Sequence, residues 1–213
     1  MSDVIREIPG AVGPLEVLLD KPARTPRAAV VFAHPLPTEG GTMHTKVVFQ
    51  GAKALARSGC AVLRFNFRGV GRSAGTWDEG RGEQDDFRAA VDFMASQYPG
   101  VELWAAGFSF GSYVALTAGA ADDRICSLVG IAPPVNKWPF SDQVRQSTKP
   151  KFLVHPEEDE LIPVKAVREF YAQLHDPKEL VVIDRANHLF DGQAGEVGDA
   201  LEELLGDFSC RTR

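Results

Sequence analysis

The sequence predicts an α/β fold: a mostly parallel, doubly wound sheet with helices on both faces. Apolar runs rich in β-branched residues recur along the chain, and from the second run onward they are almost continuously apolar. Strands that are buried on both faces of a parallel sheet have this composition. Segments with helical spacing of apolar residues lie between the runs, and such alternation is typical of a doubly wound sheet.

The predicted elements alternate along the whole chain. Residues 4–20 are expected to form an antiparallel hairpin at the edge of the sheet, with PGAVGP as its turn. The irregular segment 132–150 is too short for a cap domain, so we predict a single domain, residues 1–213, with at most a minimal lid. The predicted strands are residues 15–19, 28–33, 61–67, 101–108, 125–131, 151–155 and 180–183, and the predicted helices are residues 42–58, 83–97, 109–121, 164–175 and 193–208.

The composition limits the kind of protein this is. A chain of 213 residues with 44% hydrophobic residues is long enough to bury one sizeable core. Its net charge of −6 argues against a nucleic-acid partner. No apolar stretch approaches the ~20 residues of a membrane span, and the first residues, MSDVIREIPG, lack the apolar centre of a signal peptide. We therefore expect a cytoplasmic protein without a membrane span.

The cysteines give no sign of a metal site. Cys60, Cys126 and Cys210 are an odd number without ligand spacing, and the histidines are scattered as well. Cys60 and Cys126 lie in apolar runs, where a small buried hydrophobic residue is the expected role. We therefore predict no metal, no cofactor and a reducing compartment. The glycines of residues 69–74 fit a dinucleotide fingerprint, but no helical pattern follows them at once, so we interpret this segment as a loop.

The strongest motif is G-x-S-x-G, formed by Gly107, Ser109 and Gly111. It lies between an apolar strand and a helix, which is the context of a nucleophile elbow. A sharp turn from strand to helix needs small residues on both sides of the nucleophile, and the two glycines meet that need. The helix that follows also directs free N–H groups and the positive end of its dipole at the serine.

Partners for Ser109 follow in the order that such an elbow requires, first an acid and then a histidine. The segment PEEDELIP comes after a predicted strand, and its Asp159 is preferred over the neighbouring glutamates because a loop and then a helix follow. His188 lies in the loop after the last predicted strand, whereas His175 ends a helix. We therefore predict a catalytic triad of Ser109, Asp159 and His188, with His188 as the general base.

The segment AHPLPTEGGTM follows the strand 28–33 and should lie at the same edge of the sheet as the nucleophile. In enzymes with this elbow, one oxyanion donor comes from this loop and the other from the residue after the nucleophile. The prolines on both sides of Leu36 have no N–H. The predicted donors are therefore the backbone N–H groups of Leu36 and Phe110, and we expect His34 to hold the loop by hydrogen bonding rather than to act as a base.

Aromatic residues near the nucleophile are candidates for the substrate pocket. Phe108 and Tyr113 flank the elbow, and Trp138 and Phe140 lie in the lid-like segment. Together with His34 they form the predicted pocket. Ordinary core packing is the alternative for each of them, and Trp138 and Phe140 are also candidates for a homodimer contact.

The motifs in combination resemble a family of small, cap-less bacterial α/β-hydrolases close to the dienelactone-hydrolase group. The resemblance spans about residues 5–208 and implies the α/β-hydrolase fold with a serine triad at Ser109, Asp159 and His188. Dienelactone hydrolases use a cysteine where this chain has Ser109, and family members commonly read H-P-H-P where this chain has Leu36 in third place. The segments that carry the resemblance are AHPLPTEGGTMHTKVV, RFNFRGVGRSAGTWDEGRGEQDD, GFSFGSYVA, HPEEDELIP and ANHLF.

These observations predict a serine hydrolase that cleaves small or medium carboxylic esters through an acyl-enzyme on Ser109. A peptidase, amidase or thioesterase with the same triad is the alternative among enzymes. A non-catalytic binding protein with the same fold is the alternative outside them. The predicted partner is a small-molecule acyl substrate.

Overall fold

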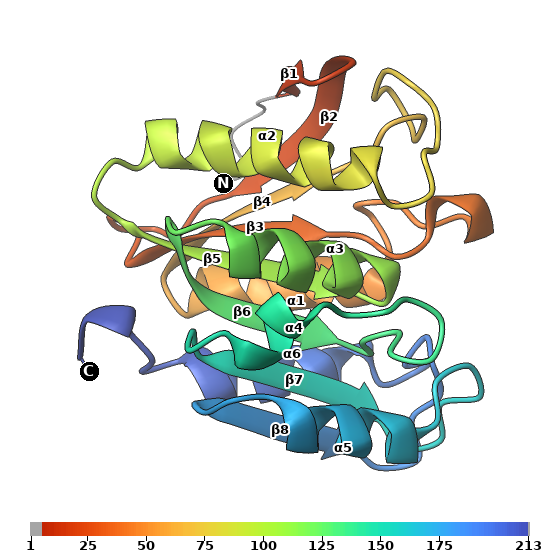
Figure 1. Ribbon diagram of the computed structural model, residues 1–213. Helices are drawn as coiled ribbons and strands as arrows, with labels where there is room; N and C mark the ends of the chain where they lie inside the picture. Colours follow the sequence, from red (N-terminus) through yellow and green to blue (C-terminus); the bar gives the residue numbers. More distant parts are fainter. Residues whose placement is uncertain (1–5, 213) are drawn as a thin grey trace.

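The computed structural model describes residues 6–212, which form one eight-stranded sheet flanked by helices (Figure 1). The order of the strands across the sheet is β1-β2-β4-β3-β5-β6-β7-β8. The strands are β1 (Glu7–Gly10), β2 (Gly13–Asp20), β3 (Ala28–Ala33), β4 (Cys60–Phe65), β5 (Glu102–Phe108), β6 (Ile125–Ile131), β7 (Lys151–Pro156) and β8 (Lys178–Ile183). The helices are α1 (Lys46–Arg57), α2 (Gly82–Gln97), α3 (Phe110–Ala121), α4 (Asp142–Gln146), α5 (Val164–Gln173) and α6 (Ala194–Leu205), with short 3-10 segments η1 (Pro37–Glu39) and η2 (Cys210–Thr212).

The sheet is parallel from β4 to β8 and antiparallel at its other edge. Strands β1 and β2 form a hairpin in which Gly10 lies opposite Gly13, so the turn falls within the predicted PGAVGP segment. The predicted hairpin is confirmed over the described residues, whereas Val4 and Ile5 lie outside them. Parallel strands place their carboxyl ends at one edge of the sheet, and the loops at that edge build the site described below.

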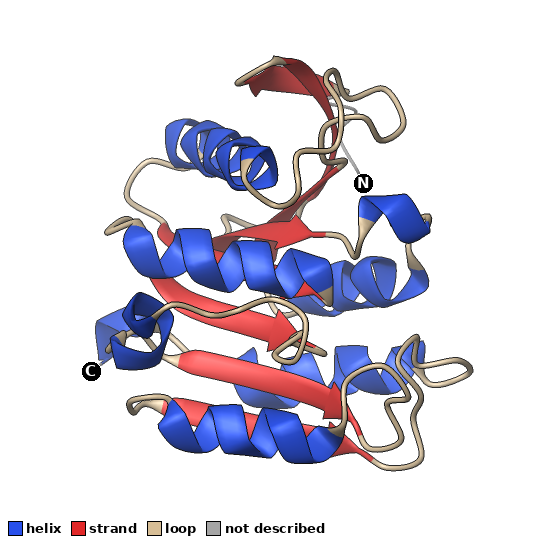
Figure 2. Cartoon of the chain, turned by 45° about the vertical axis from the view of Figure 1, so that its right-hand side comes forward, coloured by secondary structure: helices blue, strands red, loops and turns tan. Residues whose placement is uncertain are grey.

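Helices cover both faces of the sheet. Helices α2, α3 and α5 lie in front of it in Figure 1, while α1 and α6 lie behind it. The turned view of Figure 2 shows the sheet between these two layers. Each face has its own apolar cluster: Phe65 and Phe87 are buried in one, and Val30 and Leu201 are buried in the other. The predicted doubly wound α/β class is confirmed.

Two departures from the expected elements have local causes. The segment predicted as irregular, 132–150, contains the short helix α4, which is anchored by the buried side chain of Val144. Strand β4 ends at Phe65 instead of residue 67. The N–H of Asn66 still donates to the carbonyl oxygen of Glu16 at 2.9 Å, but the two N–H groups after it bind side chains. The N–H of Phe67 donates to Nε2 of His34 at 3.1 Å, and the N–H of Arg68 donates to Oδ2 of Asp86 at 2.9 Å.

The cysteines differ from the prediction. Cys60 is buried and free, as expected, but Cys126 is half-buried and forms a disulfide with Cys210. The interpretation of Cys126 as a small buried hydrophobic residue is therefore wrong. The partner lies 84 residues away, and the pair forms because the C-terminal segment folds back to the start of β6. Disulfides are rare in reducing compartments, so the cysteines no longer support the predicted cytoplasmic location, which stays a prediction.

The helices also bear on the predicted absence of a membrane span. Across residues 6–212, none of them combines the length and the apolar composition that crossing a bilayer requires.

A buried ion pair fixes the loop that follows β4. The guanidinium group of Arg68 binds both carboxylate oxygens of Asp86 in α2, with Nε–Oδ2 at 3.0 Å and Nη2–Oδ1 at 2.8 Å. The Asp86 side chain is fully buried and the Arg68 side chain is 8% exposed. A buried charge that loses its partner is strongly destabilising, so this pair ties the loop to the helix layer.

Replacing Asp86 by alanine should lower the free energy of unfolding by about 3–5 kcal/mol, because it leaves the Arg68 guanidinium buried and unpaired. Denaturant unfolding followed by circular dichroism measures the loss. Asp85→Ala is the matched control on the same helix, since Asp85 pairs with Arg88 at an exposed position and should cost under about 1 kcal/mol. Equal losses in the two variants would contradict the role given to the buried pair.

Candidate active site

Ser109 lies in a sharp turn between β5 and α3. Its backbone angles are φ 51° and ψ −121°, a conformation that a residue with a side chain rarely adopts. Gly107 and Gly111 permit the turn. A Cβ at Gly107 would lie 2.1 Å from the carbonyl oxygen of Gly111, and a Cβ at Gly111 would lie 2.4 Å from the carbonyl oxygen of Ala33. Both glycines are therefore required by close backbone packing, as the motif predicts.

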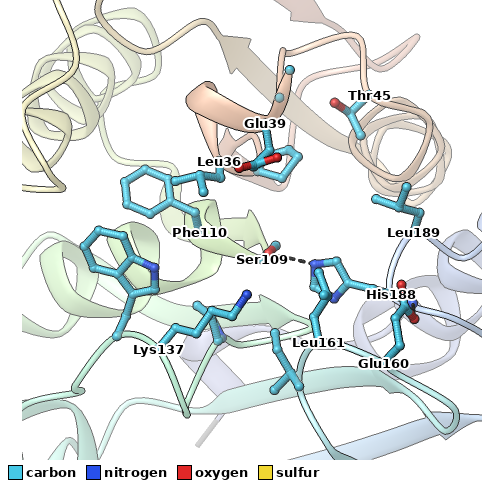
Figure 3. A pocket seen from close by; sticks show the side chains of 16 residues that line it. Leu36, Glu39, Thr45, Ser109, Phe110, Lys137, Glu160, Leu161, His188 and Leu189 are labelled. Atoms are coloured by element: carbon cyan, nitrogen blue, oxygen red, sulfur yellow. Dashed lines mark hydrogen bonds between the residues drawn. The ribbon is translucent and has the colours of Figure 1, made fainter.

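A chain of hydrogen bonds leads from Ser109 through His188 to Asp159. Oγ of Ser109 lies 3.0 Å from Nε2 of His188, and the two side chains point toward one another (Figure 3). Nδ1 of His188 lies 2.8 Å from Oδ2 of Asp159. The three side chains come from the loops after β5, β8 and β7. The structure thus brings together the three residues that the sequence predicts as a triad.

Asp159 is held as a carboxylate by its surroundings. Its Oδ1 accepts the backbone N–H groups of Leu161 at 2.9 Å and Ile162 at 2.8 Å. Burial acts to raise the pKa of this carboxyl, but the hydrogen bond and charge of His188, together with the two N–H donors, hold the pKa below its usual range. Asp159 is therefore ionised at neutral pH and able to fix the orientation of the His188 ring.

A second histidine, His155 at the end of β7, lies beneath the Asp159 loop. It is fully buried, and its Nε2 lies 2.9 Å from the carbonyl oxygen of Ile162 and 3.9 Å from Oδ2 of Asp159. Burial lowers the pKa of His155, and the Asp159 carboxylate opposes this only in part. The ring is therefore neutral, and its Nε2–H donates to the carbonyl oxygen of Ile162. This hydrogen bond ties the loop that carries Asp159 to the end of β7.

Two neighbours fix the position of His188. Phe108 is buried and stacks on the imidazole ring with ring centres 5.6 Å apart. The carboxylate of Glu160 accepts the backbone N–H of His188 at 3.1 Å. Phe108 was predicted as a wall of the pocket, and the structure places it behind the histidine instead.

His34 stabilises the loop after β3 without reaching the cavity. Its side chain is fully buried, its Nδ1 lies 2.7 Å from the carbonyl oxygen of Pro35, and its Nε2 accepts the N–H of Phe67. Burial lowers the pKa of His34 to about 4, although the hydrogen bond to Pro35 acts in the opposite direction. A neutral ring donates from Nδ1 and accepts at Nε2, so His34 joins the loop after β3 to the loop after β4.

The predicted oxyanion donors are the backbone N–H groups of Leu36 and Phe110. Leu36 precedes η1, and its N–H has no hydrogen-bond acceptor within residues 6–212. Phe110 is the first residue of α3, and the first N–H groups of a helix have no partner within it. Leu36 and Phe110 both line the cavity that contains Ser109, and their role as oxyanion donors stays a prediction.

A cavity of about 630 Å³ opens beside Ser109. Its size is in the range of small-molecule sites. Of the five side chains predicted for the pocket, Trp138 lines this cavity, whereas His34, Phe108, Tyr113 and Phe140 do not. Its lining residues are Pro35, Leu36, Glu39, Gly40, Gly41, Thr45, Ser109, Phe110, Pro134, Lys137, Trp138, Glu160, Leu161, Ile162, His188 and Leu189.

Tyr113 and Phe140 support the wall instead of forming it. The Trp138 ring packs on Phe110 with centres 5.0 Å apart and on Tyr113 at 5.1 Å, and Tyr113 in turn contacts Phe140 at 5.5 Å. Phe140 is only 4% exposed, so it offers no surface for a homodimer contact. The exposed apolar side chains at the cavity are Leu161 and Leu189. The homodimer stays a prediction.

The sequence interpretation missed several lining residues. Lys137, Leu161 and Leu189 each lie within two residues of a residue that it singled out. Their neighbours stand out by residue type, aromatic or catalytic, and that criterion excludes lysine and leucine. Glu39 and Thr45 lie in the predicted oxyanion segment or just after it, where the residue pattern gives a signal only for the backbone and the histidine.

The fold and the elbow define a cap-less serine hydrolase of the α/β-hydrolase class. A family described as serine aminopeptidase, S33, matches residues 24–141, which is more than half of the chain. The chain belongs to this family.

Similar proteins come from several bacteria. An uncharacterized protein of Rickettsia prowazekii is 32% identical over 193 residues, covering 86% of this chain and 81% of the relative. The structure of an α/β serine hydrolase homologue from Coxiella burnetii is 35% identical, covers 96% of this chain and 97% of that one, and has a TM-score of 0.89. A serine hydrolase without a lid from Xanthomonas campestris is 40% identical over 95% and 92% of the two chains, with a TM-score of 0.87. The resemblance to small cap-less bacterial hydrolases is confirmed.

His34 should make the stability of the protein depend on pH. Its pKa is about 4 in the folded protein against 6.5 unfolded, so the unfolded chain takes up a proton first as the pH falls. Its contribution to the free energy of unfolding is complete above pH 6.5 and decreases by about 3 kcal/mol as the pH falls through 4. The difference between wild type and His34→Gln, measured by denaturant unfolding across this range, should show the decrease.

The difference curve removes the titration of other groups, including His155. An NMR titration of the wild-type protein gives a second readout that does not depend on the variant folding. A His34 ring that protonates near its ordinary pKa of 6.5 would contradict the prediction.

Proposed function

We propose that this chain is a carboxylesterase that cleaves small or medium acyl esters through an acyl-enzyme on Ser109. One observation carries the proposal: the Ser109 hydroxyl, 3.0 Å from Nε2 of His188, faces a cavity whose walls are largely apolar. Leu36, Phe110 and Trp138 form one part of these walls, as expected for a site that binds an acyl chain.

In the proposed reaction, Oγ of Ser109 attacks the ester carbonyl while Nε2 of His188 takes the hydroxyl proton. The carboxylate of Asp159 holds the imidazole in the reactive orientation and stabilises the imidazolium that forms. His188 then gives the proton to the leaving alcohol, and the bond to that alcohol breaks. Water, activated by the same histidine, hydrolyses the acyl-enzyme and returns the proton to Ser109.

The negative charge that develops on the carbonyl oxygen needs hydrogen-bond donors. We assign this role to the backbone N–H groups of Leu36 and Phe110, since both are free of other acceptors and both belong to residues that line the cavity. Removal of one such donor typically costs about 10²–10³ in rate. The prolines on both sides of Leu36 restrict its backbone, and this keeps its donor in place.

An aminopeptidase is the second candidate, and one feature favours it besides the family description. The carboxylate of Glu39 lines the cavity and has no hydrogen bond or ion pair within the described part of the chain. A carboxylate at this position could bind the amino terminus of a peptide. A panel of esters, thioesters and aminoacyl amides, compared at equal concentration, distinguishes the two candidates.

The roles of the histidines predict different losses of activity. With p-nitrophenyl butyrate as substrate, Ser109→Ala and His188→Ala should each lower kcat by about 10⁴-fold or more. His34→Ala should lose at most about 10²–10³-fold, since it loosens a loop that holds a single oxyanion donor. Equal activity of wild type and Ser109→Ala would contradict the role of Ser109, whereas no hydrolysis by the wild type would favour a non-catalytic binding protein.

Trp138 should limit the length of the acyl chain. Its removal enlarges the cavity, so Trp138→Ala should shift preference toward longer p-nitrophenyl esters, by about fourfold in kcat/KM for each methylene newly accommodated. Trp77→Ala is the matched control, because Trp77 packs on Phe110 and Trp138 but does not line the cavity. An unchanged profile in Trp138→Ala, or the same shift in both variants, would argue against this wall.

A further inference from the structure

A single lysine enters the cavity beside the nucleophile. Lys137 belongs to the loop after β6, and its side chain extends into the cavity toward Ser109 (Figure 3). It is the only lysine or arginine among the cavity-lining residues in the described part of the chain.

Within residues 6–212, the ammonium group of Lys137 forms no hydrogen bond and no ion pair, so it does not stabilise the fold. Lys149, in contrast, donates to the carbonyl oxygens of Gly119 at 2.7 Å and Asp122 at 2.6 Å. Lys149 therefore stabilises the fold, whereas the charge of Lys137 is free to meet a ligand.

The backbone that carries Lys137 is anchored on both sides. The N–H groups of Lys137 and Trp138 both donate to the carbonyl oxygen of Pro134, at 3.0 and 2.9 Å. Nδ2 of Asn136 donates to the carbonyl oxygen of Leu161 on the opposite wall at 2.9 Å. These hydrogen bonds fix the backbone of Lys137, and its side chain extends from there into the space beside Ser109.

Lys137 lies on the acyl side of the site. Figure 3 shows its side chain and His188 approaching Ser109 from different sides. In the proposed reaction the leaving alcohol must lie next to His188, which protonates it, so the acyl group extends away from that histidine. Of the two carboxylates at the cavity, that of Glu160 accepts the N–H of His188, and that of Glu39 lies on the η1 loop across from Lys137.

We propose that Lys137 binds a carboxylate at the far end of the acyl group, so that the preferred substrates are monoesters of dicarboxylic acids. This inference rests on the proposed esterase function of Ser109. The apolar wall of Leu36, Phe110 and Trp138 contacts the methylene chain, and the ammonium group pairs with the terminal carboxylate.

The test compares two esters with the same six-carbon acyl chain, mono-4-nitrophenyl adipate and 4-nitrophenyl hexanoate. Lys137→Gln should lower the ratio of kcat/KM for adipate to that for hexanoate by about three- to fivefold, as expected for a solvent-exposed ion pair. Raising the ionic strength should reduce the same ratio in the wild type but should not reduce it in Lys137→Gln. Lys165→Gln is the matched control, since Lys165 lies on α5 outside the cavity.

An unchanged ratio in Lys137→Gln, with hydrolysis still dependent on Ser109, overturns the role of Lys137 and leaves the esterase proposal standing. Equal hydrolysis of the hexanoate ester by wild type and Ser109→Ala instead contradicts the esterase proposal itself. A preference for 4-nitrophenyl 4-(trimethylammonio)butanoate that Glu39→Gln abolishes would also overturn the inference, because the site would then select cations.

A binding measurement provides a readout without turnover. Isothermal titration calorimetry with Ser109→Ala should detect binding of monomethyl adipate, and adding Lys137→Gln should weaken it about three- to fivefold. Methyl hexanoate, which has no carboxylate, should bind both variants equally. Equal affinity of the two variants for monomethyl adipate would overturn the assignment of Lys137 as the carboxylate site.

Discussion

Close contact between three backbone segments at the end of β5 is the constraint on which the rest of the site depends. A Cβ at Gly107 would overlap the carbonyl of Gly111, and a Cβ at Gly111 would overlap the carbonyls of Ala33 and His34. Two positions without side chains therefore let the end of β5, the start of α3 and the end of β3 meet. The same contact forces Ser109 to a φ of 51° and brings the Leu36 loop within reach of the nucleophile.

Side chains add to the backbone hydrogen bonds that hold the loops around this contact. Where β4 ends, the N–H groups of Phe67 and Arg68 donate to His34 and Asp86, so each loop is tied to a different element. Where β7 ends, Asp159 accepts two N–H groups of its own loop, and His155 binds the carbonyl of Ile162 from below. Buried polar groups satisfied in this way make a loop as well defined as a strand.

The sequence predicts the fold and the hydrogen-bonded chain of Ser109, His188 and Asp159, because each leaves a local signal. Continuous apolar runs mark the buried parallel strands, and the glycines around Ser109 mark the elbow, so the three residues of the hydrogen-bonded chain can be named in advance.

The cavity walls leave no such signal. Tyr113 and Phe140 are aromatic neighbours of the elbow and the lid, yet they pack behind Trp138, while Lys137 faces the site. Which side of a loop faces the cavity is decided by contacts such as that of Asn136 with Leu161, and these join segments far apart in the chain. The disulfide of Cys126 with Cys210 depends on tertiary folding in the same way.

The role of His34 in the AHPLP segment follows from the sequence and the structure together. His34 is the first polar residue after a buried strand, a position where catalytic groups occur often in α/β folds. Burial keeps it neutral, because its pKa falls to about 4, and both ring nitrogens are used to join two loops. The segment therefore contributes to the site through its backbone, with His34 fixing the loop and the prolines limiting its motion. Lys137, on the loop after β6, lies across the cavity from this segment. In the proposed esterase the backbone of one loop supplies a donor for the reaction, and a side chain on another loop selects the acyl group.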